Sequence, residues 1–159
     1  MDKLAMTPIT MATSKAGLAV GTTTTTTIAN TTLYSIGGKA YSKAAASNAA
    51  TPTTDYNTGA AFTAIGLNQA GVFVIGLDSS GNIKVMQGET VEYSDAGEFD
   101  HAPAFPSIPD DVCPIGYELV KVISTGSAWT MGVSNQASQT GITKVLVDVF
   151  TLPARPQVS

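Results

Sequence analysis

The residues that could perform acid–base or nucleophilic chemistry are few, and a single histidine is the one side chain whose usual pKa lies near neutrality. His101 follows Asp100 and precedes a proline-rich run. A Ser-His-Asp or Cys-His site would need this residue, and one histidine with one cysteine, Cys113, cannot supply a structural zinc site. We interpret His101 as an ordinary loop histidine. We predict no catalytic residue, no metal and no cofactor, so the protein is not expected to be an enzyme.

Carboxylates are concentrated in one part of the chain. The densest acidic stretch contains Glu89, Glu92, Asp95, Glu98 and Asp100, and the pair Asp110-Asp111 follows it. Such groups could hold a divalent cation or act as a glycosidase pair. Acidic residues in loops are usually just solvated, and we interpret these residues in that way.

A second oxygen-rich pattern lies between two apolar runs. Asp78, Ser80 and Asn82 alternate as the ligands of a calcium loop do. However, the bidentate glutamate of an EF-hand is missing, because Glu89 lies one position too far along the chain. Turn chemistry already explains Asp-Ser-Ser-Gly at 78–81, so we predict a plain hairpin turn there.

Two further patterns are typical of recognition surfaces. Aromatic residues such as Phe73, Phe105, Trp129 and Phe150 could form a sugar-binding platform, although core packing is their usual role. The run Thr22 to Thr27 resembles the threonine arrays of ice-binding faces, but it is single and unspaced. Alternate threonines of a strand point to opposite faces. We therefore interpret the run as the first strand, near a sheet edge, where it could pair with a neighbouring subunit.

The elements that must position these side chains are strands joined by short turns. Gly37-Gly38 between two β-prone runs predicts a hairpin with Tyr34 and Tyr41 on its flanking strands. Further strands are expected at 72–77, 82–87, 117–123, 128–133 and 143–150. Because hairpins dominate, the fold class is predicted to be all-β, an antiparallel β-sandwich or barrel built of short hairpins.

The chain divides into three predicted parts: an extended N-terminal arm at 1–21, a β-rich body at 22–152 and a C-terminal tail at 153–159. Within the body, the Ala/Ser/Asn-rich segment 43–57 is expected to be a loop. The segment 88–116 contains four prolines, which do not fit central strands, so a long Pro-rich surface loop is predicted there.

Composition excludes several classes of partner. Of the 159 residues 43% are hydrophobic and only 13% are charged, and the net charge is -4 with scattered basic residues. Nucleic-acid binding needs clustered Lys and Arg, so no nucleic acid is expected. No apolar stretch is long enough to span a bilayer, so no membrane partner is expected. A surface of Thr, Ser, Asn and Ala loses little when neighbours cover it, which favours oligomerisation.

Three segments together resemble small structural proteins of tailed bacteriophages, namely head decoration, cement or head-fibre proteins. They are 33–43, 71–85 and 109–120, and the resemblance as a whole extends over 22–150. It implies a β-rich trimer on the outer surface of the virion, made in the bacterial host cytoplasm, whose N-terminal segment anchors on the major capsid protein. The expected anchors are Leu4, Met6, Ile9 and Met11, and the expected inter-subunit strand residues are Thr22, Thr24 and Thr26.

We therefore consider three functions, in decreasing order of preference. The first is a non-enzymatic capsid decoration protein that oligomerises and stabilises the head. The second is a receptor- or carbohydrate-binding module of a head or tail fibre, with a site around 92–105. The third, a hydrolase, needs two carboxylates of the acidic stretch in one cleft.

Overall fold

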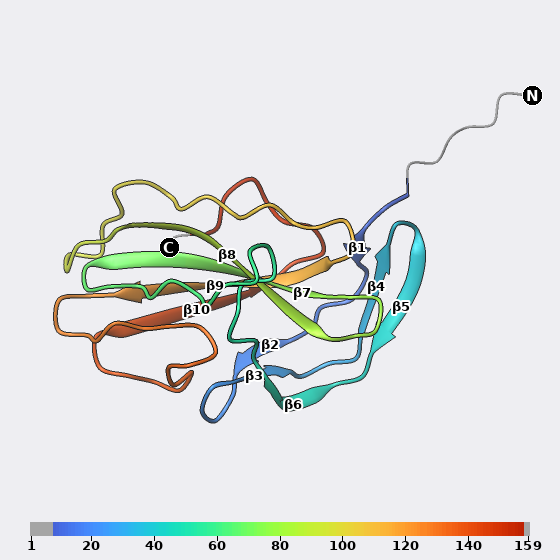
Figure 1. Ribbon diagram of the computed structural model, residues 1–159, viewed down its shortest axis with the longest axis horizontal. Helices are drawn as coiled ribbons and strands as arrows, with labels where there is room; N and C mark the ends of the chain where they lie inside the picture. Colours follow the sequence, from blue (N-terminus) through green and yellow to red (C-terminus); the bar gives the residue numbers. More distant parts are fainter. Residues whose placement is uncertain (1–7, 158–159) are drawn as a thin grey trace, which may run out of the picture.

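The chain folds into strands and loops with three antiparallel sheets. The computed structural model describes residues 8–157, and within that range it contains no helix, so none that could cross a membrane (Figure 1). In chain order the strands are β1 (Met11–Ala12), β2 (Leu18–Val20), β3 (Thr25–Ile28), β4 (Thr32–Ile36), β5 (Lys39–Lys43), β6 (Ala46–Ala50), β7 (Gln69–Leu77), β8 (Ile83–Glu92), β9 (Cys113–Val122) and β10 (Ile142–Asp148). The all-β prediction is confirmed, and the sheets do not close into a barrel.

The largest sheet has the strand order β10-β9-β7-β8 and is buried on both faces. One face carries Phe73, Ile75 and Val120, and the other carries Val74 and Leu119. Continuous Val/Ile runs suit strands of this kind, because both sets of alternating side chains then leave water. The predicted hairpin over 72–87 is confirmed and is longer than expected, since β8 continues to Glu92.

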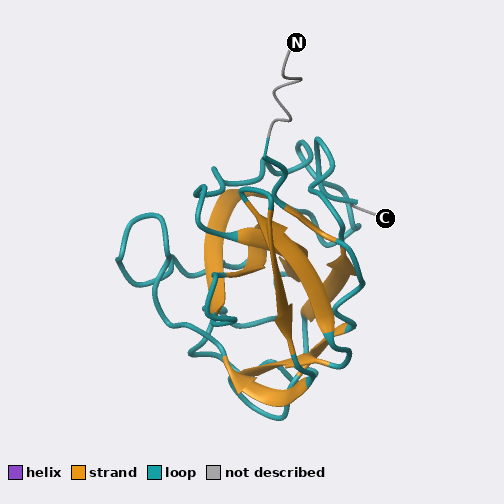
Figure 2. Ribbon diagram, turned by 90° about the vertical axis from the view of Figure 1, so that its right-hand side faces the viewer, coloured by secondary structure: helices purple, strands orange, loops and turns teal. Residues whose placement is uncertain are grey.

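The two smaller sheets cover one face of the large sheet. The order β2-β3-β6 lies beneath it, and the order β1-β4-β5 lies at one end (Figure 1). Figure 2 shows the strands surrounding a common interior, with loops at the periphery. Ala12, Ile28 and Tyr34 from these small sheets join the same core cluster as Phe73. The arrangement is a sandwich of short hairpins.

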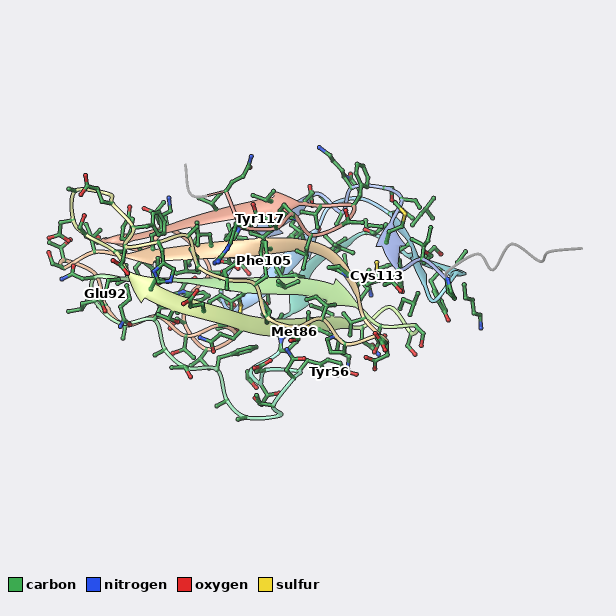
Figure 3. The ribbon with its side chains drawn as sticks, turned by 90° about the horizontal axis from the view of Figure 1, so that it is seen from above. Tyr56, Met86, Glu92, Phe105, Cys113 and Tyr117 are labelled. Carbon is green, nitrogen blue, oxygen red and sulfur yellow. The ribbon has the colours of Figure 1, made fainter. Side chains whose placement is uncertain are left out.

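The opposite face of the large sheet is covered by the Pro-rich segment rather than by strands. Residues 93–112 run above it as a long loop (Figure 1). Phe105 from this loop lies over the sheet beside Tyr117 (Figure 3), and their ring centroids are 5.0 Å apart. The predicted surface excursion is therefore confirmed for 93–112, where it covers a second core cluster. It is wrong at both ends, because β8 continues to Glu92 and Pro114 lies in the central strand β9, next to a register irregularity.

The described part of the predicted arm at 1–21 is packed into the body. Ala12 and Ala16 are fully buried, and β1 and β2 pair with strands of the body. Leu4 and Met6 lie outside the described residues. The described part of the C-terminal tail is also attached, because the Gln157 amide donates a 2.9 Å hydrogen bond to the Tyr117 hydroxyl. Strands on both sides of residue 21 therefore belong to the same sheets, and the packing does not separate an arm from a body there.

Two local predictions were wrong. The segment 43–57, expected as a loop, contains β6, which pairs with β3 despite its Ala-rich sequence. The strand expected at 128–133 is reduced to a single bridge between Trp129 and Ile65. Gly132 in that segment has a φ of +70°, a left-handed conformation that ends strand geometry.

Candidate functional site

His101 lies on an exposed loop between two carboxylates. Its Nε2 is 3.0 Å from Glu89 Oε1, and its Nδ1 is 3.0 Å from Asp100 Oδ2. Hydrogen bonds to Glu89 and Asp100 raise the pKa of His101 above its usual value. An imidazolium donates from both ring nitrogens, which is what this geometry favours. Neither nitrogen is left to take a proton from a nucleophile, so the arrangement fits the interpretation of a loop histidine.

Four of the five carboxylates of the acidic stretch line one open hollow, and Glu89 lies outside it. Glu89 accepts hydrogen bonds from His101 and the Ala104 amide, whereas Asp95 accepts hydrogen bonds from Ser124. This hollow of about 480 Å³ is lined by Asn68, Glu92, Tyr93, Ser94, Asp95, Glu98, Phe99 and Asp100. Within residues 8–157, no group of three or more His, Cys, Asp or Glu side chains is arranged to hold a metal ion.

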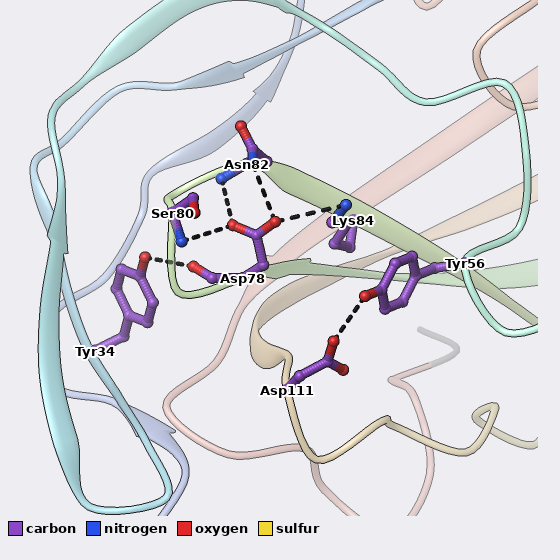
Figure 4. A network of polar contacts seen from close by, with 7 residues as sticks. All are labelled: Tyr34, Tyr56, Asp78, Ser80, Asn82, Lys84 and Asp111. Atoms are coloured by element: carbon purple, nitrogen blue, oxygen red, sulfur yellow. Dashed lines mark hydrogen bonds and ion pairs between the residues drawn. The ribbon is translucent and has the colours of Figure 1, made fainter.

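The loop at 78–82 forms the predicted hairpin turn, with its oxygens already in use (Figure 4). Asp78 Oδ1 accepts 2.9 Å hydrogen bonds from the Ser80 and Asn82 amides, and Oδ2 lies 3.5 Å from Lys84 Nζ. Partial burial would raise the pKa of Asp78, but these hydrogen bonds and the charge of Lys84 outweigh it and lower the pKa. The carboxylate is therefore engaged by its own turn.

The threonine run is in the interior of a sheet and not at an edge. β3 has β2 on one side and β6 on the other, so the expected edge position is wrong. Thr26 is buried, and its hydroxyl is 2.8 Å from that of Thr51. Thr22 and Thr24 lie before the strand in a bend, where the Thr22 amide donates to Asn48. Strand pairing of Thr26 with another subunit would have to displace a partner within the same chain.

Two of the predicted anchors, Ile9 and Met11, lie together on one surface. Side chains alternate along a strand, so Ala12, Tyr34 and Tyr41 face the core while their neighbours face outward. We call this outward surface the outer face; it comprises Ile9, Met11, Thr13, Leu33, Ser35, Ala40 and Ser42. It carries no charged residue. Ile9 and Leu33 are 57% and 49% exposed, respectively.

Hydroxyl groups on the outer face are satisfied by nearby backbone. The Ser35 hydroxyl donates to the Ile9 carbonyl at 2.9 Å, and the Thr13 hydroxyl donates to the Leu33 carbonyl at 3.1 Å. Between them lies an open hollow of about 500 Å³ lined by Pro8, Ile9, Met11, Thr13, Ser35, Gly37 and Gly38. A polar group costs little to bury once it is hydrogen-bonded. This face can therefore be covered at low cost.

One unusual residue escaped sequence analysis. Glu118 in β9 is only 1% exposed, and its Oε1 has no hydrogen-bond partner in the described structure. Burial raises the pKa of Glu118 to about 7, while the nearby charge of Lys144 opposes that rise. The available signal was its position, because Glu118 interrupts the otherwise apolar run from Tyr117 to Val120.

Comparisons of the chain with protein-family models, with curated proteins and with solved structures found no match.

Proposed function

We propose that this protein is a non-enzymatic capsid decoration, or cement, protein of a tailed bacteriophage. In this proposal it forms homo-oligomers, with a trimer favoured, and binds the major capsid protein on the outer surface of the head after synthesis in the host cytoplasm. The observation that carries the proposal is the outer face, where the predicted anchors Ile9 and Met11 lie beside Leu33 on a surface without charge.

The proposed binding rests on burial of apolar surface without the loss of hydrogen bonds. Fully burying an exposed Ile or Leu side chain contributes roughly 1.5–3 kcal/mol, and a half-exposed one roughly half of that, before the entropic cost of association. Ile9 and Leu33 both start about half exposed, and the hydroxyls beside them already have partners. One such contact is weak. Several copies in an oligomer would engage a shell together and raise the effective affinity steeply.

Binding to empty tailed-phage heads tests the proposal by co-sedimentation. Leu33→Asp and Ile9→Asp place a charge on the outer face and should abolish co-sedimentation. Val133→Asp is the matched control, because Val133 is 63% exposed away from that face. Unchanged binding of both outer-face variants would overturn the proposal. Truncation at residue 21 is unsuitable, since it would remove the buried Ala12 and Ala16. Mass measurement of the native protein tests the trimer.

A second candidate, a receptor- or carbohydrate-binding fibre module, is favoured by the hollow at 92–100. Its lining combines the rings of Tyr93 and Phe99, 4.8 Å apart, with the carboxylates of Glu92 and Glu98. Aromatic faces with a few polar groups are typical of small-molecule sites. Glycan-array binding that is lost in Phe99→Ala but kept in Leu33→Asp would favour this function over capsid decoration.

A further inference from the structure

Glu118 lies in a mainly apolar layer, and the same face of β10 carries two charged residues, Lys144 and Asp148. Its register partners are Phe73 on β7 and Leu146 on β10. Lys144 lies opposite Val120, so it is the diagonal cross-strand neighbour of Glu118 on the same face. Diagonal neighbours are roughly 7–8 Å apart at the backbone, which a lysine side chain can bridge.

Lys144 nevertheless binds elsewhere. Its ammonium donates a 2.8 Å hydrogen bond to the Asn135 carbonyl and a longer one to the Ala137 carbonyl. The Asn135 carbonyl also accepts a 3.1 Å hydrogen bond from the Trp129 indole. The Lys144 ammonium lies 5.0 Å from the centre of the Trp129 ring. Lys144 thus holds residues 128–139, which we call the cover segment, against the large sheet.

The first part of the cover segment is anchored in the core, where Trp129 and Met131 are fully buried. The rest is held by fewer contacts: the Gln136 amide donates to the Thr23 carbonyl, and a single bridge joins Gln139 to Ile142. Gln136 is buried, and its Oε1, like Glu118 Oε1, has no partner in the described structure. A buried polar atom without a partner is costly.

We propose that Lys144 is a proton-controlled latch, which holds the cover segment while Glu118 is neutral and pairs with Glu118 once that carboxyl ionises. A buried carboxylate needs a nearby cation, and leaving it unpaired is strongly destabilising. No ion pair joins Lys144 to Glu118 within residues 8–157, so the ammonium has to move toward Glu118, and away from the Asn135 and Ala137 carbonyls, to form one. The cover segment would then loosen from the edge of β10. This inference is independent of the proposed capsid role.

The other charged residue on this face is Asp148, whose carboxylate accepts hydrogen bonds from the Gly17 and Leu18 amides. β7 contributes Phe73, the cover segment contributes Trp129, Met131 and Gln136, and β2 and β3 contribute Leu18 and Ile28. Lys144 is the charge within residues 8–157 that acts on Glu118. The pKa of Lys144 is below its usual value, because burial lowers it by more than the nearby Glu118 carboxylate raises it.

The single tryptophan of the chain makes the latch directly measurable. Fluorescence of Trp129 in the full-length protein should change between pH 5 and 9, with a midpoint near 7, the pKa of buried Glu118. Glu118→Gln keeps a neutral side chain of the same shape and should abolish the change. His101→Gln, which removes the exposed histidine, should leave it intact. A wild-type protein without the transition, or a Glu118→Gln variant that retains it, would overturn the latch.

Amide exchange provides the second measurement. After correction for intrinsic rates, amides of 133–139 should exchange faster at pH 8.5 than at pH 5.5 in the wild type, and equally at both values in Glu118→Gln. Lys144→Met should exchange fast at both values, because the cover segment then lacks its latch. Slow, pH-independent exchange in Lys144→Met would contradict the assignment of Lys144.

Discussion

The hydroxyl of Tyr34 donates a 2.8 Å hydrogen bond to the carbonyl oxygen of Asp78. This contact joins β4 to the turn between β7 and β8, two elements far apart in the chain (Figure 4). On its other side the Tyr34 ring stacks on Tyr41 at 5.6 Å. The sheet β1-β4-β5 is therefore attached to the large sheet through its inner face, which carries Tyr34. Its opposite side is the outer face, so the proposed docking residues lie on a sheet that is held in place.

Replacing Tyr34 by Phe should lower the free energy of unfolding by about 1 kcal/mol, the typical net contribution of one hydrogen bond. The ring and its stacking remain, so shell binding should change little. Urea unfolding measures the effect. Tyr41→Phe is the matched control and should be nearly neutral, since its hydroxyl has no hydrogen bond within residues 8–157. Equal losses in the two variants would contradict the role of the Asp78 contact.

Local signals in the sequence predicted the hairpins well. Gly37 and Gly38 both have positive φ, as the tight turn requires, and Tyr34 lies directly opposite Tyr41. The turn at 78–81 follows from Asp78, whose carboxylate binds the amides of its own loop. Such features are encoded within a few residues.

Features that depend on strand pairing between distant parts of the chain could not be predicted from the sequence. β6 is rich in alanine, which has weak β propensity, and it becomes a strand because β3 supplies a partner from beyond the intervening β4–β5 hairpin. The same pairing moved Thr26 from an expected edge to the interior. Glu118 received no prediction, and it is buried because both faces of β9 are covered. Burial of that kind depends on segments distant in the chain, and the pattern of one strand does not reveal it.

Gly132→Ala should destabilise the protein more than Gly37→Ala. Both glycines have positive φ, a conformation that costs an L-residue about 1–2 kcal/mol. A methyl group on Gly37 would meet open space, whereas one on Gly132 would collide with the Pro52 carbonyl. The added overpacking should cost about 1–3 kcal/mol more. Thermal unfolding of the two variants compares them, and equal melting temperatures would argue against the close contact at Pro52.

Cys113 should be inert in the native protein. The thiol is fully buried, and burial raises its pKa to about 11, so almost no reactive thiolate exists near neutral pH. An aromatic disulfide reagent at pH 8 should therefore label no thiol in buffer and one thiol in concentrated urea. Rapid labelling without denaturant would show that β9 opens locally at its first residue.

Glu118 should make stability fall as the pH rises. Its pKa is raised from 4.5 to about 7 in the folded protein, so between these values the folded state holds a proton that the unfolded state has lost. Stability is then highest below about pH 4.5, declines through this window and levels off above pH 7. The shift corresponds to about 3 kcal/mol. Urea unfolding at several pH values should show this decline in the wild type relative to Glu118→Gln, a difference that cancels titration elsewhere. A difference that stays constant from pH 5 to 8 would mean that Glu118 ionises in the folded state as readily as in water.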